Sequence, residues 1–137
     1  MAISYAVMKT RNPKDPETDY FHGRAVKTSD YDFEDLAADV QMSTSLTEAD
    51  VMGVLRAMKG YIVKALLNGR VVVLNDIGRF QIALKGKCYN AETLADKEFK
   101  PADMILGHKI VFRPDPRLKE EVRKEFKLQR ISSDAMA

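Results

Sequence analysis

The side chains that could carry catalysis or hold a metal are few and scattered in this sequence. It contains two histidines, His22 and His108, and one cysteine, Cys88. Two distant histidines and one thiol do not form the ligand spacing of a zinc site. No glycine-rich loop of the kind that cradles phosphates is present. Cys88 lacks the signature of a nucleophile, and a semi-buried thiol is the simpler interpretation. We therefore expect no enzyme activity, no metal or cofactor, and no small-molecule substrate.

The basic side chains are the other candidates for chemistry, and they are unevenly distributed. Residues 28–50 contain seven acids and no lysine or arginine, whereas residues 51–90 contain seven bases and one acid. Residues 111–137 contain seven bases and five acids. The net charge of +2 is too small to indicate nucleic-acid binding by itself, and ordinary solvated faces are the alternative. Bases that cluster on one surface would bind the phosphates of a polyanion.

The composition is typical of a globular domain. The 137 residues are 45% hydrophobic and 31% charged, which suits one domain with a modest core. No apolar run approaches the length of a membrane span, and the N-terminus lacks the pattern of a secretory signal. Together with the single cysteine, this favours a cytoplasmic protein without a membrane partner.

The most regular element is a helix over residues 47–68. Thr47 is a favourable N-cap with Asp50 at the capping-box position, and Gly69 is suited to end the helix. The apolar stripe of this helix consists of Val51, Val54, Leu55, Met58, Ile62, Ala65 and Leu66. A shorter helix is expected from Phe33 to Val40, capped by Asp32 and broken by residues 41–45.

Several strands should surround these helices. Residues 3–9 and 20–27 predict a hairpin, residues 70–74 and 79–84 a second strand pair, and residues 110–112 a short strand. Gly78 in the turn 75–78 is free to take a positive φ. After Asp115 as cap, a helix begins at Pro116. If the later strands form one sheet, its bases converge: Arg70 and Arg79 on adjacent strands, Lys85 and Lys87 beyond them, and Arg113 and Arg117 after the last strand.

Residues 32–84 and 109–123 resemble the HU/IHF family of bacterial histone-like DNA-binding proteins. The resemblance lies in the two successive helices, in Gly78-Arg79-Phe80 as the Gly-x-Phe turn, and in the closing segment FRPDPRLKEEV. It implies an α+β fold in which a helical body lies under an antiparallel β-saddle, in an intertwined homodimer. It also implies β-arms that enter the minor groove, where apolar wedges kink the duplex.

Two departures narrow the resemblance to a longer HU-like branch. The arm, residues 85–109, contains no arginine and is reduced, with Pro101 as its possible wedge, and Ala83 stands where the family often has arginine. About 28 residues precede the first helix, and their strands could pair with the saddle or cover its edges.

We therefore predict a single HU-like domain over residues 1–130, with an N-terminal strand extension (1–28), a reduced arm (85–109) and a flexible tail (131–137). The predicted function is sequence-tolerant, histone-like binding of double-stranded DNA in the cytoplasmic nucleoid. The alternative is a structural or protein-interaction dimer of the same fold that has lost DNA bending. The predicted DNA-binding residues are Arg70, Arg79, Lys85, Lys87, Lys100, Arg113, Arg117 and Lys119, with Pro101 as the wedge.

Overall fold

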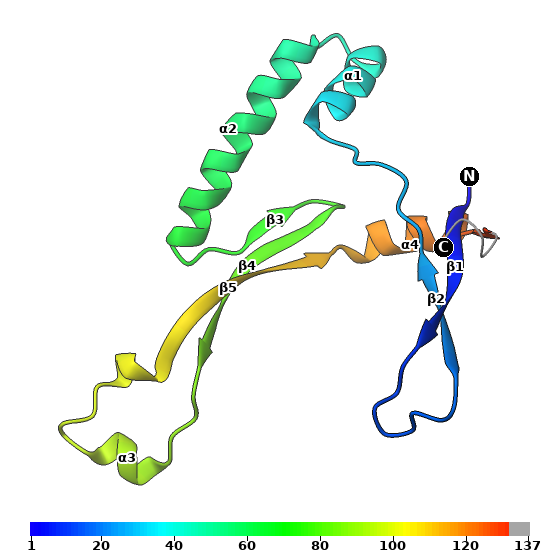
Figure 1. The fold of residues 1–137 in the computed structure, drawn as a ribbon. Coiled ribbons are helices and arrows are strands. Elements are labelled where there is room, and N and C mark those ends of the chain that lie inside the picture. Colours follow the sequence, from blue (N-terminus) through cyan, green and yellow to red (C-terminus); the bar gives the residue numbers. More distant parts are fainter. Residues whose placement is uncertain (132–137) are drawn as a thin grey trace. The chain divides into compact units, whose positions relative to one another are not determined.

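A computed structural model describes residues 1–131. Its architecture is α+β, as predicted, and Figure 1 shows the elements in chain order. They are β1 (Ile3–Thr10), β2 (Tyr20–Ala25), α1 (Phe33–Ser43), α2 (Glu48–Leu67), β3 (Val72–Leu74), β4 (Gly78–Gly86), α3 (Ala91–Ala95), the 3-10 turn η1 (Pro101–Met104), β5 (Ile105–Pro114), α4 (Pro116–Glu125) and β6 (Leu128–Arg130).

The chain divides into two compact units. One combines Met1–Asp32 with the residues from Glu120 onward, and the other is Phe33–Lys119. The single domain that we assign to residues 1–130 stays a prediction for the assembled protein. The predicted flexible tail lies, apart from Ile131, outside the described residues.

Helix α2 has the ends that its sequence predicts. The Thr47 side chain accepts a hydrogen bond from the Asp50 N–H at 3.2 Å, and the Asp50 carboxylate accepts one from the Thr47 N–H at 3.3 Å. Gly69 has a φ of 75°, which lets the Arg70 N–H donate to the Ala65 carbonyl at 3.0 Å. The capping box and the glycine stop are thus both confirmed.

Helix α1 runs three residues further than predicted, to Ser43, and contacts α2. The break predicted at residues 41–45 is present at 44 and 45 but wrong for 41–43, where polar side chains satisfy the end of the helix. The hydroxyl of Thr44 donates to the Val40 carbonyl at 2.9 Å. The side-chain oxygen of Gln41 accepts from the Glu48 N–H at 2.8 Å and so links the two helices.

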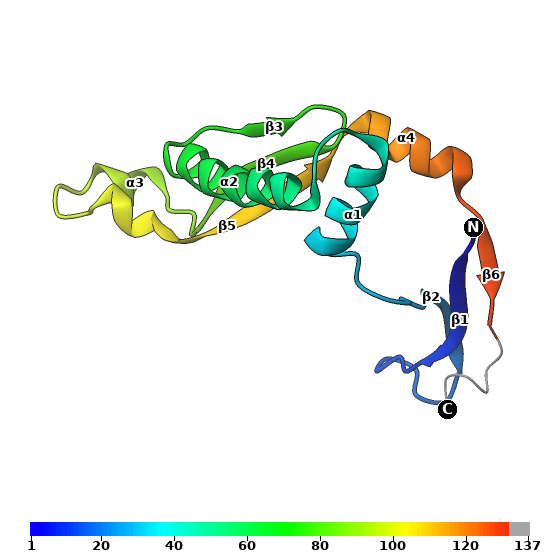
Figure 2. The ribbon, with the colours of Figure 1, turned by 90° about the horizontal axis from the view of Figure 1, so that it is seen from above.

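The sheet of Phe33–Lys119 has the order β3-β4-β5 and is antiparallel throughout. Helix α2 contacts β3 and β4, and Figure 2 shows it lying along this sheet. Strand β5 spans Ile105–Pro114, much longer than the predicted 110–112. Arg70 precedes β3 instead of lying in it, because its backbone still closes the end of α2. The positive φ of the β3–β4 turn belongs to Asp76 (68°), so its prediction for Gly78 is wrong.

The N-terminal strands form a sheet of their own with the order β2-β1-β6. The predicted hairpin is present, and β1 also pairs in parallel with β6 near the C-terminus. Within this chain, the extra strands therefore do not pair with the β3-β4-β5 sheet. Strand β6 was missed because three residues, Leu128–Arg130, give too short a pattern to predict.

The described part of the chain has a very small core. The apolar residues buried in it are Ala6, Ala37, Val51 and Leu66. The chain exposes 12080 Å², whereas a folded monomer of this mass exposes about 7200 Å². Much apolar surface on α2, β5 and α4 is consequently left without cover in a single chain.

Candidate nucleic-acid interface

The register of the β3-β4-β5 sheet brings two arginines side by side. Arg79 on β4 lies directly opposite Arg113 on β5. Lys85 and Lys109 follow on the same face, because they lie an even number of residues from these arginines and are paired with Gly107 and Ala83. We call this set of Arg79, Lys85, Lys109 and Arg113 the basic face; all four side chains are exposed.

The opposite face of the same strands is apolar. Phe80 and Phe112 are paired across β4 and β5, and their ring centroids are 4.8 Å apart. Ile82 lies opposite Ile110 on this side. Basic and apolar residues therefore alternate along the strands. The apolar face is suited to pack against other protein elements, and the basic face is suited to bind an anion.

Gly78 explains how β5 can approach β4 so closely at the arginine pair. A Cβ at Gly78 would lie 2.6 Å from the Arg113 carbonyl oxygen and 2.6 Å from the Phe112 ring. Glycine is needed here for close approach of the neighbouring strand, and not for a positive φ. The Phe112 ring occupies the space where a side chain at position 78 would lie, and Arg113 is held opposite Arg79.

The basic face repels itself electrostatically. Like charges directly opposite each other in a sheet are destabilising, and Arg79 and Arg113 are such a pair. Lys85 and Lys109 are diagonal neighbours, offset by two residues in the register. A row of phosphates would remove this repulsion, whereas a neutral ligand would not.

The start of α4 is tied to the β3–β4 turn beside the basic face. The Asp115 N–H donates to the Ile77 carbonyl at 2.9 Å, and the Asp115 carboxylate accepts from the Arg117 N–H at 2.9 Å. The Arg117 guanidinium forms an ion pair with the Asp76 carboxylate at 2.7 Å. Arg117 thus already has an acidic partner within the chain.

The reduced arm ends in short helical turns. Lys87 donates its backbone N–H to the Met104 carbonyl at 3.1 Å and closes the segment between them. Asn90 caps α3 by accepting from the Thr93 N–H at 2.8 Å, and the rings of Tyr89 and Phe99 are 5.1 Å apart. The outer part of the arm, residues 87–104, carries three lysines and four carboxylates, so this part is not basic.

The structure thus brings together three of the eight residues predicted to bind DNA: Arg79, Lys85 and Arg113. Arg70 lies between α2 and β3, and Lys87 lies past a register shift at Lys85/Gly86. Lys100 and Pro101 lie in the folded arm, and Lys119 is exposed on α4. The role of each in DNA binding stays a prediction.

Lys109 is the residue of the basic face that sequence reasoning did not include. It was overlooked because β5 was predicted to begin at residue 110. The two-residue spacing of Lys109, Val111 and Arg113 was the signal that could have placed it on the same face as Arg113.

Cys88 is exposed, so its prediction as a semi-buried thiol is wrong. Among residues 1–131, no group of histidine, cysteine and acidic side chains could hold a metal ion. No helix among these residues is long and apolar enough to cross a membrane.

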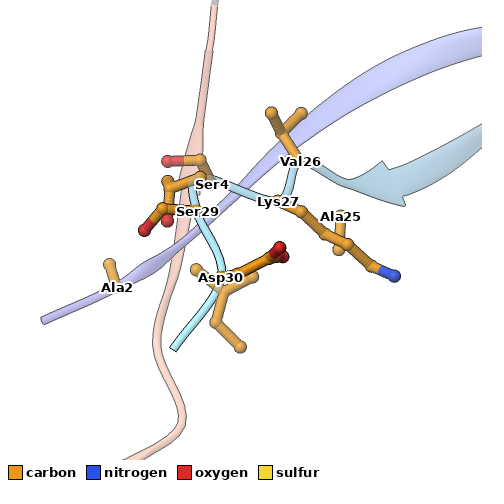
Figure 3. Close-up of a pocket in the computed structure, with 9 residues that line it drawn as sticks. Ala2, Ser4, Ala25, Val26, Lys27, Ser29 and Asp30 are labelled. Carbon is orange, nitrogen blue, oxygen red and sulfur yellow. The ribbon is translucent and has the colours of Figure 1, made fainter. Parts of the chain in front are cut away.

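A hollow of about 580 Å³ lies beside the N-terminal sheet (Figure 3). Ser4, Ala25, Lys27 and Asp30 are among the residues that line it. Because Lys27 and Asp30 contribute opposite charges, the hollow has no excess of either sign, and we assign no ligand to it.

Comparison with known proteins identifies the family. The model of the HU-HIG family, described as an HU domain fused to wHTH, Ig, or glycine-rich motif, matches residues 1–130. The chain belongs to this family. The predicted HU-like family is thereby confirmed, as is the HU-like fold.

Two solved structures resemble this HU-HIG protein. A putative bacterial DNA binding protein from Bacteroides vulgatus ATCC 8482 is 13% identical with a TM-score of 0.59; the match covers 95% of this chain and 48% of that one. The HU protein of an Anabaena HU-DNA cocrystal structure is 22% identical with a TM-score of 0.47, covering 66% of this chain and 96% of that one. This chain thus spans about half the length of the Bacteroides protein. No curated protein matches it.

Proposed function

We propose that this HU-HIG protein is a sequence-tolerant, nucleoid-associated protein of the cytoplasm that binds double-stranded DNA as a homodimer. The observation that carries the proposal is the pairing of Arg79 with Arg113 on a sheet face that also bears Lys85 and Lys109. Membership of an HU family supports the choice of DNA as the polyanion.

The basic face suits phosphates better than base edges. Its side chains are long, exposed cations on a sheet, and the positions between them hold Gln81, Ala83 and Val111. Besides its four cations, each of which matches a phosphate oxygen, this face offers one amide that could contact a base edge. Binding would therefore depend on backbone geometry and little on sequence.

The surface of α2 and α4 supports a homodimer. Val54, Tyr61 and Leu67 on α2 are each more than 60% exposed, so much of the apolar surface of this helix lies in water in a single chain. Val122 on α4 and Phe126, which directly follows the helix, are both exposed. A second copy that covers these side chains would remove the apolar surface that one chain leaves in water.

The structure of the reduced arm bears on whether the protein bends DNA. Because the outer part of the arm, residues 87–104, carries more carboxylates than lysines and contains short helices, it is poorly suited to enter the minor groove. Pro101, the possible wedge, begins η1. This observation favours the second candidate, a structural or protein-interaction dimer in which DNA bending by the arms has been lost.

Salt dependence distinguishes the two candidates. We expect a duplex of random sequence to bind at about 50 mM salt and to lose more than a thousandfold in affinity at about 200 mM. Equal affinity for unrelated duplexes is expected at each salt concentration. A protein that fails to bind duplex DNA at 50 mM, while sedimenting as a dimer, would support the structural role instead.

A further inference from the structure

The N-terminal sheet combines aromatic and basic side chains without an acid. Strands β1, β2 and β6 contain Lys9, Arg24 and Arg130 but no aspartate or glutamate. They also contain three aromatic residues, Tyr5, Tyr20 and Phe21. Neither the basic face nor the proposed dimer makes use of this sheet.

The register separates these residues onto two faces. Tyr5 on β1 lies between Ala25 of β2 and Arg130 of β6, and Lys9 lies opposite Phe21. Because side chains alternate along a strand, Tyr5, Lys9, Phe21 and Arg130 all share one face. We call these four residues the stacking face. Tyr20 lies on the other face, opposite Thr10.

The stacking face leaves the Phe21 ring in solvent. Val7 lies opposite Gly23, and the half-buried Tyr5 ring lies beside this glycine, 3.8 Å from the place its Cβ would take. Phe21 is 64% exposed and Leu128, which continues the face on β6, is 56% exposed. An exposed ring beside a cation is the arrangement that holds a base by stacking and its phosphate by charge.

The positions of Tyr5 and Phe21 in the sheet favour an unpaired strand over a duplex. Tyr5 and Lys9, the partner of Phe21, are four residues apart on β1, so their backbone positions are about 13 Å apart. In a duplex the bases are about 3.4 Å apart and their faces are covered by neighbouring bases. Only a strand whose bases are unstacked can present two of them to rings carried by separate positions of a sheet.

Arg130 is the cation best placed to serve such a strand. Lys9 already forms an ion pair with Asp19 at 2.9 Å. The ion pairs found among residues 1–131 do not include Arg130, which lies beside Tyr5. We propose that the stacking face binds unpaired nucleic-acid strands, with Phe21 and Tyr5 stacking on bases and Arg130 contacting the backbone.

The test uses the full chain and a fluorescently labelled 20-residue oligothymidylate, whose binding is followed by anisotropy. Phe21→Ala should weaken binding about tenfold, within the range for loss of one stacked base. Phe21→Tyr keeps the ring and should bind as the parent does. Tyr20→Ala, on the opposite face of the same strand, is the matched control and should change little. Arg130→Ala should weaken binding and reduce its salt dependence, whereas Gln129→Ala should not.

Two further measurements separate this proposal from the function of the basic face. Arg79→Ala/Arg113→Ala should weaken duplex binding strongly, whereas oligothymidylate should still bind this variant and should still be weakened by Phe21→Ala. Binding of a 20-residue oligouridylate shows whether the ligand is RNA or DNA. Tighter binding of the oligouridylate indicates contacts to the 2′-hydroxyl, and tighter binding of the oligothymidylate indicates that such contacts are absent.

The proposal is overturned if Phe21→Ala and Tyr20→Ala have equal effects, or if the Arg79/Arg113 variant abolishes oligothymidylate binding. It is also overturned if Phe21→Ala changes self-association in sedimentation without changing strand binding. In that case the stacking face packs against protein.

Discussion

Removing the arginine pair should flatten the salt dependence of duplex binding by a calculable amount. The basic face has four cations, Arg79, Lys85, Lys109 and Arg113, and a homodimer has twice as many. Each phosphate neutralised contributes about 0.9 to the slope of log K against log salt, so the parent slope should be about −7. Between 50 and 200 mM salt, its affinity should fall by about 20,000-fold.

The variant Arg79→Ala/Arg113→Ala leaves half of these contacts. Its slope should be about −3.6, and its affinity should fall by only about 150-fold over the same range. The assay is fluorescence anisotropy with a random-sequence duplex at four salt concentrations. Lys59→Ala, which removes one exposed cation from α2, is the control for loss of charge away from the basic face and should retain the parent slope.

The reasoning is refuted if the double variant keeps the parent slope, since the two arginines then contact no phosphate. It is equally refuted if Lys59→Ala flattens the slope as much per charge as the double variant does. In that case binding responds to net charge and not to the basic face.

Three other substitutions test how the chain positions this face. Gly78→Ala should destabilise the fold by about 1–3 kcal/mol in a thermal melt, because its Cβ would lie 2.6 Å from the Phe112 ring; an unchanged melting temperature would mean that the strands separate freely. In a denaturant titration, Thr47→Ala should lower the free energy of unfolding by about 1 kcal/mol through loss of the N-cap. Thr47→Ser should retain most of that stability. Arg117→Ala should change stability by less than about 1 kcal/mol, since both partners of its ion pair with Asp76 are exposed, and should leave the duplex salt slope unchanged; a flatter slope would return Arg117 to the interface.

The parts of the fold that could be predicted are those specified by neighbouring residues. Helix α2 is defined by Thr47, Asp50 and Gly69, all of which act within one or two turns of the helix. The cap of α4 by Asp115 is equally local. Such signals are present in any short window of the sequence.

What could not be predicted depends on pairing between distant residues. Whether β5 begins at 105 or 110 is decided by its ladder with β4, and β6 exists only because β1 lies beside it. The same limit explains the candidate site. Arg79 and Arg113 were both proposed, but their direct opposition and the place of Lys109 follow from a register that the sequence does not state.

Arg117 shows a second kind of limit. Its basic character predicts a phosphate contact, but its partner Asp76 lies 41 residues away and becomes a neighbour only when the β3–β4 turn meets α4. The function of a surface charge depends on which opposite charges the fold brings to it.

Directed cross-linking to DNA tests the central claim most directly. In a Cys88→Ser background, a photoreactive group is attached to a cysteine at position 81, between the bases of the basic face, or at position 110 on the apolar face. Our account predicts that Gln81→Cys cross-links to a random-sequence duplex and that Ile110→Cys does not. Equal cross-linking from both positions, or cross-linking from position 110 alone, would contradict it.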